Sequence, residues 1–242
     1  MYDKYQKVAL TSRLGIPLIY GVDAVHGHNN VIGATIFPHN VGLGCANDYE
    51  LCRKISEATA VEVAATGINW NFSPCIAIPQ DERWGRHYEG YSEHVDIVSE
   101  MGEASIIGYQ TTELGSANHS IVACAKHFIA DGATVWGTGM GNLSDKIDRG
   151  NAPISDSLIR AKYLPPYQKA IDAGVGTVTG ALVFNEDNSA VQVYSGVTWA
   201  NVYTAPFTAT GGTTSETGGY HYHLFENPNN QQFVVQTGEG PG

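Results

Sequence analysis

Apolar runs of strand length alternate with helical stretches over residues 14–180. The runs at 16–22, 68–78, 121–125 and 175–184 predict strands of a parallel sheet, in which both faces of each strand are covered. Between them, helices are predicted from a cap at Asn47 or Asp48 to Gly67, over 93–114, and from Pro165 to Gly174. In the first of these helices Leu51, Ile55 and Ala58 share an apolar face. The alternation is typical of an α/β fold.

The pattern changes after residue 180. All 13 Lys and Arg residues precede this point, whereas residues 181–242 are rich in Gly and Thr and contain only acidic charges. β-like runs occur at 191–199, 201–208, 220–225 and 232–236. We therefore predict two parts, an α/β part over 1–180 and an unassigned β-rich or irregular part over 181–242. Four other interpretations of this second part stay open. It could be a polar edge of a single domain, poorly ordered sequence, the product of a shifted reading frame, or an artificial fusion.

The composition excludes several classes of protein. The chain has 242 residues, 43% of them hydrophobic, which is enough to bury a sizeable core. Its formal net charge of −11 and the lack of a basic stripe argue against nucleic-acid binding. No apolar run approaches the roughly 18 residues of a membrane span, and residues 1–7 lack the apolar region of a secretory signal. We expect neither nucleic acid nor a membrane as partner.

The cysteines indicate no metal or cofactor site. Cys45, Cys52, Cys75 and Cys124 lack Cys-x-x-Cys spacing, so buried thiols are the simplest interpretation. A pairing of Cys45 with Cys52 stays open. His221 and His223 could form a metal pair on one face of a strand, but no third ligand follows at a suitable spacing.

Polar side chains gather where the predicted strands end. The first strand leads to Asp23 and His26, the loop after the second strand contains 81–86, and the third strand leads to Lys126, His127 and Asp131. Because the carboxyl ends of parallel strands meet at one edge, we expect these residues to form one polar pocket. Carboxylates and cations beside Trp84 suit a hydroxyl-rich ligand such as a sugar.

Several motifs in this part, taken in order, resemble family 3 glycoside hydrolases of the β-glucosidase and exo-β-glucanase type. The resemblance covers about residues 5–178. It is carried by residues 14–27 (LGIPLIYGVDAVHG), 34–40 (ATIFPHN), 81–86 (DERWGR), 88–89 (YE), 125–128 (AKHF) and 163–167 (YLPPY). It implies a partial (β/α) barrel of the TIM type, followed by the β-rich or irregular segment.

The resemblance also implies roles for individual residues. Asp23, Arg86, Lys126 and His127 match the positions that hold the terminal glucosyl unit of the substrate. Arg83 and Trp84 belong to the same motif as supporting structure, and we place His26 with them. Charged donors and acceptors around one sugar ring would position it for reaction.

The catalytic carboxyl groups of the family are not identifiable in this sequence. A retaining glycosidase needs a nucleophile and a general acid, and the family's nucleophile lies in a Ser-Asp-Trp type motif that does not occur here. Three hypotheses therefore stay open. The chain is the glucose-binding half of a retaining β-glucoside hydrolase, a non-catalytic glycan-binding remnant, or a truncated or chimeric product whose open barrel exposes strand edges.

The expected partners are β-glucosides or β-glucan oligosaccharides. A partner chain could complete the barrel. The family is often secreted or periplasmic, and the sequence does not place this chain in any compartment.

Overall fold

A computed structural model describes residues 2–139 and 146–179 with their side chains, and the backbone of short strands between 184 and 237. The chain divides into two compact units, residues 1–182 and 183–242, and each is described by itself.

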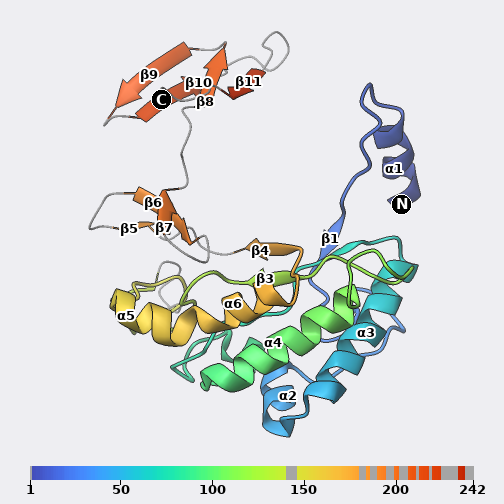
Figure 1. Ribbon diagram of the computed structural model, residues 1–242, viewed down its shortest axis with the longest axis vertical. Helices are drawn as coiled ribbons and strands as arrows, with labels where there is room; N and C mark the ends of the chain where they lie inside the picture. Colours follow the sequence, from blue (N-terminus) through green and yellow to red (C-terminus); the bar gives the residue numbers. More distant parts are fainter. Residues whose placement is uncertain are drawn as a thin grey trace. The chain divides into compact units, whose positions relative to one another are not determined.

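The first unit combines helices and short strands (Figure 1). Its helices are α1 (Tyr2–Leu10), α2 (Asn40–Ala46), α3 (Tyr49–Ala65), α4 (Val95–Gln110), α5 (Asp156–Leu158) and α6 (Pro165–Asp172), with a 3-10 turn η1 (His87–Glu89) and a π-helical turn η2 (Ile159–Tyr163). The predicted helices are therefore present, and their ends follow local rules. Asp48 accepts a hydrogen bond from the backbone of Leu51 at 2.9 Å and caps α3, and Pro165 opens α6.

The strands of the first unit are parallel neighbours in chain order. β1 (Gly21–Val22) pairs with β2 (Trp70–Asn71), and β3 (Cys124–Lys126) pairs with β4 (Thr177–Thr179). Parallel bridges from Trp70 to Val122 and from Cys75 to Lys126 join β2 to β3. The predicted α/β class and its parallel pairing are confirmed. No closed sheet forms among the residues that the structure describes.

The first three predicted strands, 16–22, 68–78 and 121–125, are shorter than expected, because only Gly21–Val22, Trp70–Asn71 and Cys124–Lys126 pair as strands. Residues 16–20 are not part of a strand, and Ile16, Leu18, Ile19 and Tyr20 are all exposed instead of buried. The end of this stretch reaches the start of β2, where the Trp70 amide donates to the carbonyl of Tyr20 at 3.2 Å. A cavity of about 400 Å³ lies between α1 and this stretch, lined by Tyr2, Tyr5, Leu18, Tyr20, Thr66 and Ile68. The apolar run at 16–22 thus predicts that the chain leads to the sheet beside β2, but it does not predict that residues 16–20 are exposed.

The helices pack on one another through small residues, and Figure 1 shows α4 lying between α3 and α6. The buried face of α3 consists of Cys52, Ser56, Thr59, Ala60 and Val63. The predicted face was wrong, because Leu51 and Ala58 are exposed and Ile55 is half-buried. Ser56 approaches α4 at Gly108, where a Cβ atom would come within 2.6 Å of the serine Cβ. Close approach of the two backbones, and not the size of the apolar side chains, therefore selects the face.

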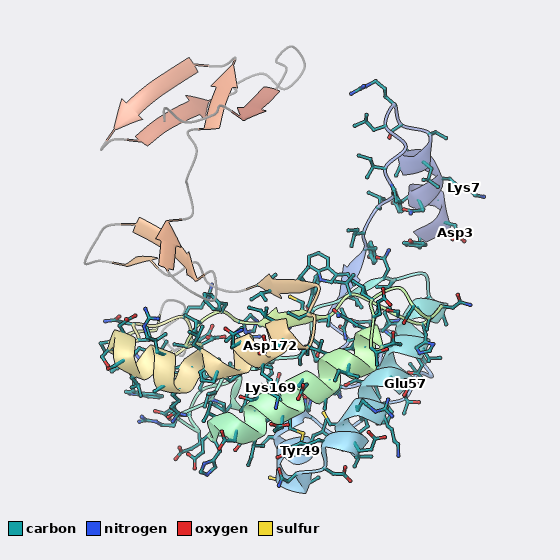
Figure 2. The ribbon with its side chains drawn as sticks, in the orientation of Figure 1. Asp3, Lys7, Tyr49, Glu57, Lys169 and Asp172 are labelled. Carbon is teal, nitrogen blue, oxygen red and sulfur yellow. The ribbon has the colours of Figure 1, made fainter. Side chains whose placement is uncertain are left out.

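An ion-pair cluster joins α4 to α6. Lys169, labelled in Figure 2, contacts Glu100 and lies 3.1 Å from Glu103. Hydrogen bonds to both carboxylates raise the pKa of Lys169.

The second unit contains antiparallel strand pairs, in line with a β-rich segment. β5 (Phe184–Asn185), β6 (Ala190–Tyr194) and β7 (Trp199–Asn201) form one sheet. β8 (Phe207–Thr210) pairs with β11 (Val234–Thr237), and β9 (Thr213–Thr217) pairs with β10 (Tyr220–Leu224). The side chains of His221 and His223, which the sequence left open as a metal pair without a third ligand, lie outside the described side chains, and the identity of this unit stays open.

The four thiols are free. Cys52, Cys75 and Cys124 are buried as expected, whereas Cys45 is exposed and does not pair with Cys52. Across the described part of the chain, no helix is long and apolar enough to cross a membrane.

Candidate functional site

The site is built where β1 and β3 end. Lys126, the last residue of β3, donates through Nζ to Oδ1 of Asp23, which follows β1, at 2.8 Å. The Lys126 side chain is only 6% exposed, whereas that of Asp23 is 63% exposed. The ion pair therefore fixes one carboxylate oxygen, while the rest of the carboxylate faces solvent.

A buried amide holds the backbone beside Asp23. The side chain of Asn71 in β2 accepts from the Ala24 amide and donates to the Ala24 carbonyl, both at 2.9 Å. Asn71 is fully buried. Sequence reasoning missed this positioning residue, although a polar residue between Trp70 and Phe72 in an apolar strand was a signal.

A second group of charges lies beside the first. Arg86 donates to both carboxylate oxygens of Glu89, at 2.7 and 2.8 Å, and these bonds raise the pKa of Arg86 above its usual value. Its Nη2 atom also lies 3.0 Å from Nε2 of His127. Because a guanidinium can only donate, Nε2 must accept, so the ring proton of a neutral His127 is on Nδ1. That nitrogen lies 2.9 Å from Oδ2 of Asp131.

The structure thus brings the four predicted sugar-binding residues together in two pairs, Asp23 with Lys126 and Arg86 with His127. The pairs are linked because Lys126 and His127 are consecutive. Glu89 and Asp131 complete the group, and only Asp131 was singled out among the candidate pocket residues. Under this group lies Cys75, and its burial raises the pKa of the thiol to about 12.

The supporting residues lie around the two pairs. The ring of His26 stacks on His39 at 4.0 Å between centroids, and His39 contacts Tyr88 edge-on at 4.6 Å. Trp84 is buried and donates to Asp148 at 3.2 Å. Arg83 lies over the ring of Trp136 at 4.2 Å.

This arrangement can bind a ligand rich in hydroxyl groups, because it offers charged donors and acceptors at one edge of the sheet. Its carboxylates, Asp23, Glu89 and Asp131, each lie against a cation or an imidazole. No group of His, Cys, Asp and Glu residues within the described ranges could hold a metal ion.

α/β proteins commonly bind their ligands at the carboxyl ends of parallel strands. The position of the charged residues therefore places this chain among the α/β proteins that bind a ligand at that edge of the sheet. Residues 1–196 match the Glycosyl hydrolase family 3 N terminal domain, and the chain belongs to this family. The match extends beyond the range of 5–178 over which the motifs carry the resemblance.

Relatives and solved structures agree with this assignment. The chain is 35% identical to the lysosomal beta glucosidase of Dictyostelium discoideum over 168 residues, and 32% identical to the periplasmic beta-glucosidase of Salmonella typhimurium over 176 residues. These alignments cover 67% and 73% of this chain but only 19% and 21% of the relatives, so the chain spans about a fifth of their length.

Two solved structures illustrate the similarity of fold. The exo-1,3/1,4-beta-glucanase of a Pseudoalteromonas species is 42% identical, with a TM-score of 0.65 over 73% of this chain and 22% of that one. A mutant beta-glucosidase of Listeria innocua in complex with laminaribiose is 35% identical, with a TM-score of 0.64 over 74% of this chain and 23% of that one.

Proposed function

We propose that this chain is the sugar-binding half of a β-glucoside hydrolase of the retaining type, built on a partial (β/α) barrel. Asp23, Arg86, Lys126 and His127 would hold the terminal glucosyl unit. The names of the relatives support this class of substrate, since they are beta-glucosidases and an exo-beta-glucanase.

One observation carries the proposal. Lys126 forms an ion pair with Asp23, although the two residues are 103 positions apart in the sequence. The pair lies at the ends of β1 and β3, beside Arg86 and His127. An exposed carboxylate can accept hydrogen bonds from two neighbouring hydroxyls, and the buried ammonium holds it in one orientation. A single sugar ring would therefore meet an acceptor and several donors without displacing a core side chain.

The same contacts argue against hydrolysis by this chain alone. Retention requires two carboxyl groups about 5–5.5 Å apart, one free to attack and one able to give up a proton. Arg86 binds both oxygens of Glu89, Lys126 binds one oxygen of Asp23, and one oxygen of Asp131 lies 2.9 Å from the imidazole of His127, so none of the three carboxylates is without a charged or imidazole neighbour. A glycan-binding protein without catalysis is thus the second candidate, and the absent Ser-Asp-Trp motif favours it.

Sugar binding tests the proposal. Titration calorimetry with glucose and gluconolactone should show binding by the wild type and at least tenfold weaker binding by Asp23→Asn, since a charge-assisted hydrogen bond contributes about 1.5–3 kcal/mol. The asparagine keeps an oxygen that can accept from Lys126 but loses the negative charge, so the melting temperature should fall less than in Asp23→Ala. Asp3→Asn, an exposed change on α1, is the matched control (Figure 2). Equal sugar affinity in wild type and Asp23→Asn would contradict the proposal.

Hydrolysis separates the two candidates. Turnover of an aryl β-glucoside by the chain alone should be close to the uncatalysed rate. Glu216 and Glu226 are late glutamates with aromatic residues nearby in the sequence. Robust turnover that Glu216→Gln or Glu226→Gln abolishes would show that the second unit supplies a catalytic carboxyl group.

A further inference from the structure

Two side chains hold the guanidinium of Arg86. Its Nε and Nη2 atoms donate to the carboxylate of Glu89 at 2.7 and 2.8 Å, and Nη2 also lies 3.0 Å from Nε2 of His127. A guanidinium has five N–H groups, two of them on Nη1. Nη1 forms no hydrogen bond with any residue that the structure describes, so its N–H groups are the ones that Arg86 can offer to a sugar hydroxyl. Their direction depends on Glu89 and His127.

The contact between Arg86 and His127 requires one tautomer of the imidazole. Nε2 can accept from Arg86 only while it carries no proton, so the ring proton must be on Nδ1. Nδ1 is buried and has no well-aligned hydrogen-bond partner among the described side chains, but Oδ2 of Asp131 lies 2.9 Å from it. A carboxylate at this distance repels the lone pair of a bare nitrogen and attracts an N–H group. Asp131 therefore favours the tautomer that Arg86 requires.

The turn that carries Asp131 is itself fixed. The amide of Gln80 donates to the carbonyl of Gly132 at 3.0 Å, and a Cβ atom at Gly132 would come within 2.6 Å of the ring of Trp84. Gly132 also has a φ of +86°, which favours glycine. The side chains of His127 and Asp131 are only 22% and 17% exposed. Water therefore has little access to the contact, and the position of the carboxylate is set by the backbone around it.

We infer that Asp131 is a positioning residue of the proposed sugar-binding site, which holds His127 with its ring proton on Nδ1, so that Nε2 stays an acceptor for Arg86 and the guanidinium keeps one orientation toward the sugar. The inference rests on the proposed function. Asp131 acts through His127 and needs no contact with the sugar. Without the carboxylate, the ring could turn away or carry its proton on Nε2, where it would face another donor.

Calorimetry with glucose tests the effect on binding. Asp131→Ala should bind glucose about tenfold more weakly than wild type, as expected when one hydrogen bond from a charged donor is misaligned. Asp148→Ala is the matched control, because Asp148 is a partly buried aspartate that accepts from Trp84 and should leave the affinity unchanged. An equal loss of affinity in the two variants would overturn the inference, since a general loosening of this region would then be the cause.

Proton NMR separates positioning from a merely structural role. The Nδ1 proton of His127, buried beside a carboxylate, should give a downfield resonance that His127→Phe lacks. Asp131→Ala should shift this resonance upfield. Asp131→Asn should do the same, and because it keeps the shape of the side chain it provides the test if the alanine variant does not fold. A resonance at the wild-type position in the Asp131 variants would overturn the inference.

The outcomes distinguish this inference from the proposed function. Wild-type affinity for glucose in Asp131→Ala, together with weaker binding by Asp23→Asn, would overturn the inference and leave the proposed function standing. If the wild type binds no glucose, the proposed function is wrong, and the inference is wrong with it.

Discussion

The ion pair of Asp23 and Lys126 joins an exposed carboxylate to a buried ammonium group. The loss of the partner therefore costs Lys126 more free energy than it costs Asp23. Lys126 is surrounded by protein and its charge requires a partner, whereas water can solvate Asp23. Removing the carboxylate therefore threatens the fold as well as the site. This asymmetry is why Asp23→Asn, and not Asp23→Ala, is the sharper test of sugar binding.

Buried Asn71 should contribute more to the free energy of unfolding than exposed Asn30, although both side chains bond the backbone at residues 23–24. We expect Asn71→Ala to leave the amide and carbonyl of Ala24 without partners in the interior, at about 1–3 kcal/mol for each group. Urea denaturation measures the loss. Asn30→Ala is the control, because its exposed side chain donates to the Asp23 carbonyl at 3.0 Å and water can replace it. Equal losses in the two variants would contradict this role.

His28 should make stability depend on pH. Burial lowers its pKa, and the nearby Glu62 opposes this only in part. Below the usual histidine pKa of about 6.5 the unfolded chain takes up a proton first, so the free energy of unfolding falls as pH falls, until the folded form is protonated too. His39 has a lowered pKa as well, chiefly through burial, and contributes in the same direction.

Thermal melts between pH 8 and pH 5 measure this effect. His28→Gln should show a smaller decrease of melting temperature over this range than wild type. His94→Gln, an exposed change before α4, is the control and should keep the wild-type slope. Identical slopes for wild type and His28→Gln would refute the prediction.

At the scale of elements, α3 and α4 depend on the absence of a side chain at Gly108. A Cβ atom there would lie 2.4 Å from the Arg53 carbonyl oxygen and 3.0 Å from the Glu57 amide. Both neighbours are backbone atoms, so the helices would have to separate. We expect Gly108→Ala to cost about 1–3 kcal/mol through overpacking, which outweighs the gain of up to about 1 kcal/mol in helix propensity.

Chemical denaturation of Gly108→Ala tests this packing. Gly85→Ala serves as the control, because no atom lies within 4 Å of a Cβ at that position. A Gly108→Ala protein as stable as wild type would show that the two helices can move apart without loss.

At the scale of the whole first unit, the stretch that leads into β1 exposes apolar residues. Ile16 and Ile19 are 63% and 67% exposed, and β1 pairs with β2 alone among the strands that the structure describes. An exposed apolar edge favours association with other chains.

We therefore expect association that increases with protein concentration and decreases in Ile19→Lys. Light scattering over a range of concentrations measures it. Ile171→Lys on α6 replaces an isoleucine of comparable exposure away from the edge, and should leave association unchanged. Equal association of wild type and Ile19→Lys would rule out this edge as the cause.

The sequence by itself determined the alternation of strands with the helices α3, α4 and α6, and the candidate residues at the strand ends, because these depend on local signals, whereas it did not predict α1, α2 and α5. Asp48 caps its helix, Pro165 opens another, and the functional side chains directly follow strands. The family motifs lie in the same local stretches. The difference in composition between residues 1–180, which contain every Lys and Arg, and residues 181–242 can likewise be seen in the sequence without any knowledge of tertiary contacts.

Only the tertiary structure decided which side chains meet. The contacts of Lys126 with Asp23, of Arg86 with His127 and of Asn71 with Ala24 join residues 41 to 103 positions apart, and no local pattern encodes such a distance. The same holds for the buried face of α3, which the close approach of α4 selects one residue away from the larger apolar side chains. Burial of residues 16–20 likewise depends on what packs against them, so their apolar character alone could not predict that they are exposed.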